Sequence, residues 1–318
     1  MRYRSLGRSG LNVSEIGHGL WGMGSWTGSD DEASKAALRR SIEGGCTFYD
    51  SAFVYGDGKS DALIGGVANE YPQKPLVLAS KIPPADFTWP SKPTNKLHQI
   101  FPRAHVLEYA GRIAESFGRP IDLLQFHVWE DAWAREAEWQ DTVAELKQSG
   151  RIKAFGLSLN RWQPENGLAA IETGLIDSVQ VIYNIFDQAP EDLLFPACRQ
   201  HRVGVIARVP LDEGSLGGKM TAETKFPAGD WRARYFNADN LAKTLPRIAA
   251  LKALLPAGMD LPEMALRFIL SEPTVSTVIV GMRAFAHVDA NLALPDKGPL
   301  PAELIAALRA HRWDRRPS

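Results

Sequence analysis

Eight short apolar or β-branched segments, each followed by a helical segment, dominate the chain of 318 residues. Strands that alternate with helices form parallel sheets, and strands buried on both faces appear as continuous apolar runs. Eight such units in about this length favour a closed barrel over an open, doubly wound sheet. We therefore predict an α/β fold in which residues 1–318 form a single (β/α)8 TIM-barrel domain. The expected strands cover residues 16–20, 47–49, 76–80, 121–126, 152–157, 178–181, 203–207 and 277–280.

Helices are predicted from apolar periodicity and from start and stop signals. Ser29, with Glu32 three residues later, fits a capping box, so the first helix is expected over residues 33–43. Turn signals predict an N-terminal hairpin within residues 3–15, and the Pro-rich residues 83–102 predict a long loop. The remaining helices are expected over residues 61–70, 104–117, 136–148, 164–173, 189–200, 241–254, 261–270, 286–292 and 302–311.

Composition narrows the range of partners. The net charge of -1 gives no electrostatic reason to bind nucleic acid or an anionic membrane. Neither a run of 18 apolar residues nor an apolar leader occurs, so we expect no transmembrane helix and no signal segment. Two cysteines, Cys46 and Cys198, are too few for a disulfide framework or a structural zinc site, and no metal-ligand spacing occurs. A cytoplasmic protein without a bound metal is expected, whereas the oligomeric state stays open.

Titratable residues follow three consecutive strands. Asp50 ends the run that begins at Thr47, and Lys81 and His127 directly follow the next two apolar runs. Because the C-terminal ends of barrel strands face one mouth, these three side chains should be neighbours. Tyr55 lies in the loop after the second strand and should hang over them. A single Asp is most often a surface carboxylate, whereas four such residues on adjoining strand ends indicate one site.

This combination suits proton transfer. Tyrosine has a pKa of about 10, and a nearby ammonium favours tyrosinate, so Lys81 should lower the pKa of Tyr55. Asp50 would keep Lys81 charged, and His127 would hydrogen-bond a substrate oxygen. The site could then donate a proton to a carbonyl oxygen or accept one from an alcohol. An aldolase that forms a Schiff base through Lys81 is a further alternative.

Two later segments could hold a phosphorylated cofactor. The glycine-rich loop from Leu211 to Lys219 follows the seventh strand, a common phosphate position in barrels. Arg283 follows the last strand, and its forked donors suit a phosphate monoester. His287 and Asn291 are four residues apart, so they share one face of the next helix.

A G-x-G-x-x-G pattern over residues 17–22 is not interpreted as a Rossmann motif. That motif requires a helix to begin at once, and the capping box lies several residues later. We expect these glycines to let a loop pass close to a ligand.

Together these residues resemble the aldo-keto reductase family over essentially the whole chain. The family implies a (β/α)8 barrel that reduces a small-molecule aldehyde or ketone with NADPH, releasing NADP+. It implies that Tyr55 is the general acid, assisted by Asp50, Lys81 and His127. The matching signals are Tyr49-Asp50-Ser51-Ala52 with Tyr55, Ser80-Lys81, Leu124-Gln125-Phe126-His127, Gln180 with Tyr183-Asn184, and Ile279-Val280-Gly281 with Arg283 and Asn291.

The resemblance also implies cofactor contacts. Ser158 and Gln180 would bind the nicotinamide carboxamide. The loop containing Gly214 and Lys219 would wrap the pyrophosphate, and Arg283 would hold the 2′-phosphate. The other residues expected at the cofactor are Trp21, Arg208, Leu211, Leu216, Gly281, His287 and, at the adenine, Asn291.

Three positions depart from the family pattern. Leu159 separates Ser158 from Asn160, which leaves Asn160 in doubt as a carboxamide ligand. Arg208 occupies the place of an aromatic residue that often stacks on nicotinamide, and it could stack there or contact cofactor oxygens. His287 replaces a common Gln or Arg, so the choice between NADPH and NADH stays open.

An NADPH-binding redox-sensor module with slow turnover, as in potassium-channel β-subunits, is the alternative function. The complete set of Asp50, Tyr55, Lys81 and His127 favours catalysis over that alternative. The substrate itself is not encoded in any motif. Candidates to line an apolar pocket, each of which could equally be a packing residue, are Trp21, Phe53, Trp89, Trp129 and Trp231.

Overall fold

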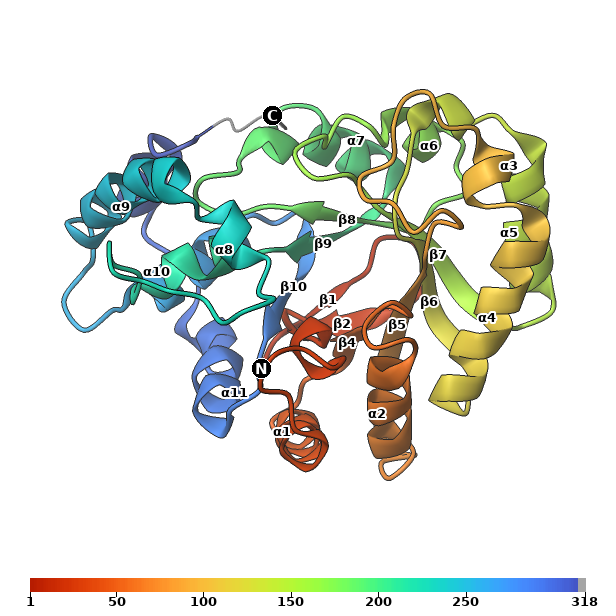
Figure 1. Cartoon of the computed structure of the whole chain (residues 1–318), viewed down its shortest axis with the longest axis horizontal. Helices are drawn as coiled ribbons and strands as arrows, with labels where there is room; N and C mark the ends of the chain where they lie inside the picture. The colour runs from red at the N-terminus through yellow and green to blue at the C-terminus, as the bar shows by residue number, and fades with distance from the viewer. Residues whose placement is uncertain (314–318) are drawn as a thin grey trace.

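Eight parallel strands close into a barrel in this computed structural model, which describes residues 1–313 (Figure 1). Each strand pairs with the next along the chain, and β10 closes the ring against β3. The predicted (β/α)8 barrel is confirmed. Its strands are β3 (Ile16–Gly19), β4 (Phe48–Asp50), β5 (Val77–Ile82), β6 (Ile121–Phe126), β7 (Ile152–Ser158), β8 (Ser178–Ile182), β9 (Gly204–Arg208) and β10 (Val275–Gly281).

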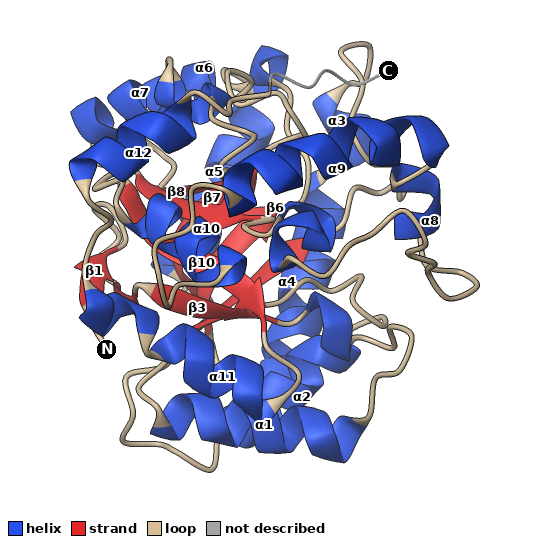
Figure 2. Ribbon diagram, turned by 90° about the vertical axis from the view of Figure 1, so that its left-hand side faces the viewer, coloured by secondary structure: helices blue, strands red, loops and turns tan. Residues whose placement is uncertain are grey.

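Helices cover the outside of the barrel, and α11, α1 and α2 lie side by side along one flank (Figures 1 and 2). No helix of residues 1–313 is long and apolar enough to cross a membrane. The α-helices are α1 (Asp31–Glu43), α2 (Lys59–Ala68), α3 (Leu97–Ile100), α4 (Arg103–Phe117), α5 (Ala137–Gln148), α6 (Leu168–Glu172), α7 (Leu194–His201), α8 (Arg232–Tyr235), α9 (Ala238–Lys252), α10 (Leu261–Leu270), α11 (Phe285–Leu292) and α12 (Ala302–Arg309).

An apolar cluster, which we call the apolar layer, fills the barrel interior next to the N-terminal hairpin. Gly17 is required there, because a Cβ atom at this position would lie 2.9 Å from the Phe48 ring. Gly17 therefore makes room for core packing rather than for a phosphate. The apolar layer consists of Phe48, Val77, Ala79, Leu123, Ala154, Ile206 and Ile279, together with Leu6 and Val13 from the N-terminal hairpin.

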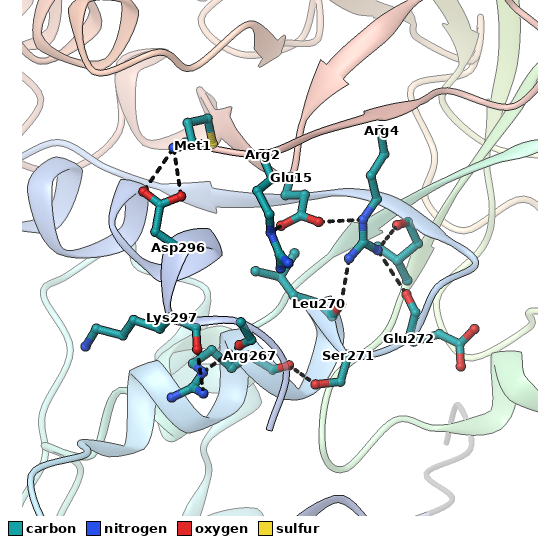
Figure 3. A network of polar contacts seen from close by, with 12 residues as sticks. Met1, Arg2, Arg4, Glu15, Arg267, Leu270, Ser271, Glu272, Asp296 and Lys297 are labelled. Carbon is teal, nitrogen blue, oxygen red and sulfur yellow. Dashed lines mark hydrogen bonds and ion pairs between the residues drawn. The ribbon is translucent and has the colours of Figure 1, made fainter. Parts of the chain in front are cut away.

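The predicted hairpin is present and consists of antiparallel strands β1 (Tyr3–Ser5) and β2 (Asn12–Ser14). Arg4 attaches it to the end of the barrel core: its guanidinium donates to Glu15 Oε1 at 2.7 Å and to the Leu270 carbonyl at 2.7 Å (Figure 3). Since Leu6 and Val13 join the apolar layer, the hairpin closes the barrel at the end opposite the strand C-termini.

Several expected boundaries are wrong for local reasons. Asp30, rather than Ser29, caps α1, because its carboxylate accepts the Ala33 backbone N–H at 2.7 Å. The Pro-rich segment is not entirely loop, since α3 buries two apolar side chains within it. α6 is much shorter than expected, and a 3-10 turn containing Pro190 precedes α7, which begins only at Leu194.

Candidate active site

A fully buried ion pair lies at the C-terminal end of the barrel. Lys81 Nζ donates to Asp50 Oδ2 at 2.6 Å and to the Ser51 carbonyl at 2.7 Å. Asp50 is the last residue of β4, whereas Lys81 lies inside β5, not after it as expected. Burial alone would lower the pKa of Lys81, but Asp50 and Tyr55 raise it overall. Lys81 is therefore a fixed ammonium, which does not suit it as a Schiff-base nucleophile.

Two glutamines hold the other oxygen of Asp50. Gln180 Nε2 donates to Asp50 Oδ1 at 2.8 Å, and Gln125 Nε2 lies 3.4 Å from the same atom. Sequence reasoning did not assign Gln125 a role, although it is a polar residue within the apolar run of β6. The two amides fix the carboxylate that positions Lys81.

Tyr55 comes next to this pair from the loop between β4 and α2. Lys81 Nζ lies 5.3 Å from the centroid of its ring, and the ring meets His127 edge-on with 6.1 Å between centroids. Gly24, in the segment after β3, permits this arrangement, because a Cβ atom there would lie 2.4 Å from the Tyr55 backbone. The structure thus brings together Asp50, Tyr55, Lys81 and His127.

Burial of Tyr55 affects its pKa more strongly than the nearby Lys81 ammonium does. Loss of solvation raises the pKa of Tyr55, and the opposing charges of Lys81 and Arg208 offset this only in part. The expected lowering by Lys81 is present, but the net shift is upward. The pKa of His127 falls well below its ordinary value because of burial, Lys81 and Arg208. The mouth therefore holds a protonated phenol and a neutral imidazole at neutral pH.

Arg208 is the last residue of β9, and its charge lowers the pKa of Tyr55 and of His127. Its Nη2 donates to the Leu159 carbonyl at 2.9 Å, while its Nε is buried and has no partner among residues 1–313. Burial and the charge of Arg161 lower the pKa of Arg208 to about 10. The guanidinium is therefore charged at neutral pH but only partly hydrogen-bonded.

Ser158 and Asn160 lie in different environments. Ser158 ends β7 directly opposite Gln180 in the strand register, so both face the mouth. Asn160 Nδ2 instead donates to the Trp129 carbonyl and to Glu130 Oε1, each at 3.0 Å. The Asn160 amide nitrogen is therefore engaged by the loop that follows His127, whereas the strand register places Ser158 opposite Gln180.

The loop after β9 has an unusual backbone. Val209, Asp212 and Glu213 have φ values of 54°, 43° and 55°, in the left-handed region that β-branched and bulky residues rarely adopt. Asn184 Nδ2 holds the Val209 carbonyl at 3.0 Å. Strained backbone of this kind persists where surrounding contacts impose it, often at ligand sites. The expected loop residues Leu211, Gly214, Leu216 and Lys219 all lie in this segment.

Arg283 lies beyond β10, which ends at Gly281. Its side chain is exposed and donates to the Thr27 carbonyl at 3.2 Å, so it spans the gap to the segment after β3. His287 and Asn291 follow on α11. Arg283 and His287 are exposed and carry hydrogen-bond donors that could bind an anion.

No cluster of three or more His, Cys, Asp or Glu side chains within residues 1–313 could hold a metal.

The five aromatic pocket candidates divide into two groups. Trp89 is 40% exposed and lies 5.4 Å from the His127 ring, and Trp21 and Trp231 are partly exposed and 6.3 Å apart. Phe53 and Trp129 are buried within the hydrophobic core, so packing is the role that the structure shows for these two. Of these five candidates, Trp89 is the one whose ring lies beside His127.

Comparison with known proteins agrees with this geometry. A sequence profile described as "Aldo/keto reductase family" matches residues 15–312. The chain is 27% identical to "Aldo-keto reductase YhdN" of Bacillus subtilis, covering 91% of this chain and 87% of that protein. It is 25% identical to the "NADH-specific methylglyoxal reductase" of Escherichia coli, covering 92% and 93%. The holo form of aldo-keto reductase AKR11C1 from Bacillus halodurans superposes with a TM-score of 0.78 at 26% identity, covering 99% and 97%.

Proposed function

Because this chain belongs to the aldo/keto reductase family, we propose that it reduces aldehydes or ketones with NADPH, with Tyr55 as the proton donor. Enzymes of this family are NAD(P)H-dependent oxidoreductases that act on carbonyl groups, and this chain is one of them. The observation that carries the proposal is the buried Lys81–Asp50 pair, 2.6 Å long, whose ammonium lies 5.3 Å from the Tyr55 ring.

The nicotinamide cofactor, when bound, supplies the hydride. Neutral His127 donates a hydrogen bond to the carbonyl oxygen and orients it toward Tyr55. Tyr55 then transfers its hydroxyl proton to that oxygen as negative charge develops on it. The Lys81 ammonium stabilises the phenolate that remains, and Asp50 keeps Lys81 in place. Solvent returns the proton to Tyr55 before the next turnover.

The donor set at the mouth fits a nicotinamide carboxamide. Gln180 Nε2 is committed to Asp50 at 2.8 Å, so its Oε1 is the atom left to accept an amide hydrogen. The Ser158 hydroxyl, opposite Gln180 in the register, can donate to the amide oxygen. Together these two residues would orient the carboxamide without Asn160.

The outer cations fit the phosphates. Lys219 ends the strained loop after β9, which would enclose the pyrophosphate together with Leu211, Gly214 and Leu216. Arg283 would hold the 2′-phosphate, with His287 beside it and Asn291 at the adenine. The charge and fork of Arg283 support NADPH over NADH, although a relative carries the name of an NADH-specific reductase.

The proposal is tested by NADPH oxidation across a panel of aldehydes, ketones and quinones, with the alcohol product identified. Steady turnover on at least one carbonyl class is expected. A single burst without steady turnover would instead support the redox-sensor alternative, and no oxidation with any carbonyl would overturn the proposed activity. Borohydride trapping of a carbonyl on Lys81 is expected to fail, because its ammonium is fixed by Asp50.

A further inference from the structure

We propose that Arg208 binds a carboxylate of the substrate, so the preferred substrates are aldehydes or ketones that carry a carboxylate group. This inference rests on the proposed carbonyl reduction and adds a substrate class to it. The family resemblance does not supply this role, because an aromatic residue is usual at this position.

Charge balance at the mouth is the first argument. Three cations lie near one another there: Lys81, Arg161 and Arg208. Lys81 is paired with Asp50, and Arg161 is paired with Glu213. Arg208 has no carboxylate within ion-pair distance among residues 1–313. It is therefore the cation at the mouth whose charge a ligand can still neutralise.

Hydrogen bonding gives the second argument. A guanidinium has five N–H donors, and Arg208 satisfies one of them on the Leu159 carbonyl while its buried Nε finds no partner. A buried donor without a partner is costly, and a carboxylate satisfies two such donors at once through the guanidinium fork. An anion with this geometry would remove both the charge and the hydrogen-bond deficit.

Position gives the third argument. Arg208 is the last residue of β9, so it lies at the same end of the barrel as Tyr55 and His127, and its charge lowers the pKa of both. An anion on Arg208 and a carbonyl on Tyr55 can therefore belong to one small molecule. A cofactor phosphate is the other possible anion, but the exposed cations Lys219 and Arg283 lie on separate segments suited to that role.

The experiment compares matched substrates. 4-Carboxybenzaldehyde and methyl 4-formylbenzoate differ in one negative charge and are assayed for kcat/KM with NADPH. The wild-type protein should prefer the acid, and Arg208→Gln should reduce that preference roughly ten- to hundred-fold, the scale of a charge-assisted hydrogen bond. Arg208→Lys should restore part of it, because it keeps the charge and loses the fork.

Two controls identify the source of any effect. Arg199→Gln removes an exposed cation from α7 that bonds to Thr274, before the start of β10, and should leave the acid preference unchanged. Benzoate and benzamide binding, followed by tryptophan fluorescence, tests Arg208 without turnover, since Trp89 lies 5.4 Å from His127. Wild type should bind benzoate more tightly than benzamide, and Arg208→Gln should not.

Three outcomes would overturn the inference. These are equal rates for acid and ester in the wild-type protein, an unchanged preference in Arg208→Gln, or a loss of NADPH and NADH affinity in that variant with the preference intact. The last outcome would make Arg208 a cofactor residue. If neither aldehyde consumes NADPH, the proposed reduction fails for both, and the benzoate comparison still decides the role of Arg208.

Discussion

Two layers of the barrel interior lie only two residues apart on the same strands, yet they differ completely in character. Phe48, Ala79 and Leu123 belong to the apolar layer, whereas Asp50, Lys81 and Gln125 follow each of them at the second position. Successive side chains on a strand alternate between its faces, so residues two apart point to the same side. With Ser158, Gln180 and Arg208 these residues form the polar layer at the mouth.

The comparison separates stability from function. Burial of apolar side chains stabilises the fold in proportion to the area removed from water. Burying an ion pair costs desolvation energy that the mutual attraction of the charges only partly offsets. We infer that the apolar layer stabilises the barrel, whereas the polar layer contributes to catalysis and cofactor binding at a cost in stability. The variants Lys81→Met, Leu123→Ala and Tyr55→Phe test this division.

The largest effect is expected for Lys81→Met. It leaves the Asp50 carboxylate buried without its cation and should lower the free energy of unfolding by about 3–5 kcal/mol. The double variant Asp50→Leu with Lys81→Met removes both charges and should recover most of that stability without activity. Urea unfolding of the three proteins measures this. A Lys81→Met protein as stable as wild type would show that the pair is not a buried, coupled unit.

In the apolar layer, Leu123→Ala should cost about 2–5 kcal/mol of unfolding free energy through lost burial and the cavity left behind. Leu123 is fully buried and two residues from Gln125. The kcat of the folded protein should stay near the wild-type value below the unfolding transition. A large fall in kcat without loss of stability would contradict the separation of the two layers.

Tyr55→Phe should have the opposite effect to Leu123→Ala, because it should lower activity and leave stability unchanged. Carbonyl reduction should fall roughly a hundredfold or more, about 2.7 kcal/mol of transition-state stabilisation, because the proton donor is lost. Unfolding free energy and NADPH affinity should remain close to wild type. Reduction at the wild-type rate would remove Tyr55 from the mechanism.

Arg283→Ala probes the outer edge of the site. A charge-assisted hydrogen bond to the 2′-phosphate contributes about 1.5–3 kcal/mol, so NADPH affinity should fall roughly ten- to hundredfold. NADH affinity should hardly change, and the NADPH preference should weaken as salt rises. Titration with both cofactors by tryptophan fluorescence measures this. Equal losses for both cofactors would place the phosphate site elsewhere.

The smallest expected effect is a shift in pH profile. Reduction requires protonated Tyr55, so the rate should fall as pH rises through its pKa. Lys81 and Arg208 each lower that pKa, and their removal in Lys81→Met or Arg208→Gln should move the falling limb to higher pH. The residual activity of each variant is compared with wild type from neutral to alkaline pH. An unchanged limb in both would mean that neither cation is coupled to the titrating group.

The sequence alone determined the barrel and the meeting of Asp50, Tyr55, Lys81 and His127. Both follow from the alternation of strands and helices, because the C-terminal ends of parallel strands must share one mouth. The order of the strands along the chain is enough to place these strand ends side by side.

Only the tertiary structure decided which side chains pair within that mouth. The contact of Gln180 with Asp50 joins residues 130 positions apart. Arg161 pairs with Glu213, whereas Arg208 has no carboxylate at ion-pair distance within residues 1–313. The pKa of Tyr55 also depends on the three-dimensional surroundings, since burial there exceeds the pull of Lys81. Strand order fixes which ends are neighbours, whereas hydrogen bonds and solvation depend on side-chain positions across the whole barrel.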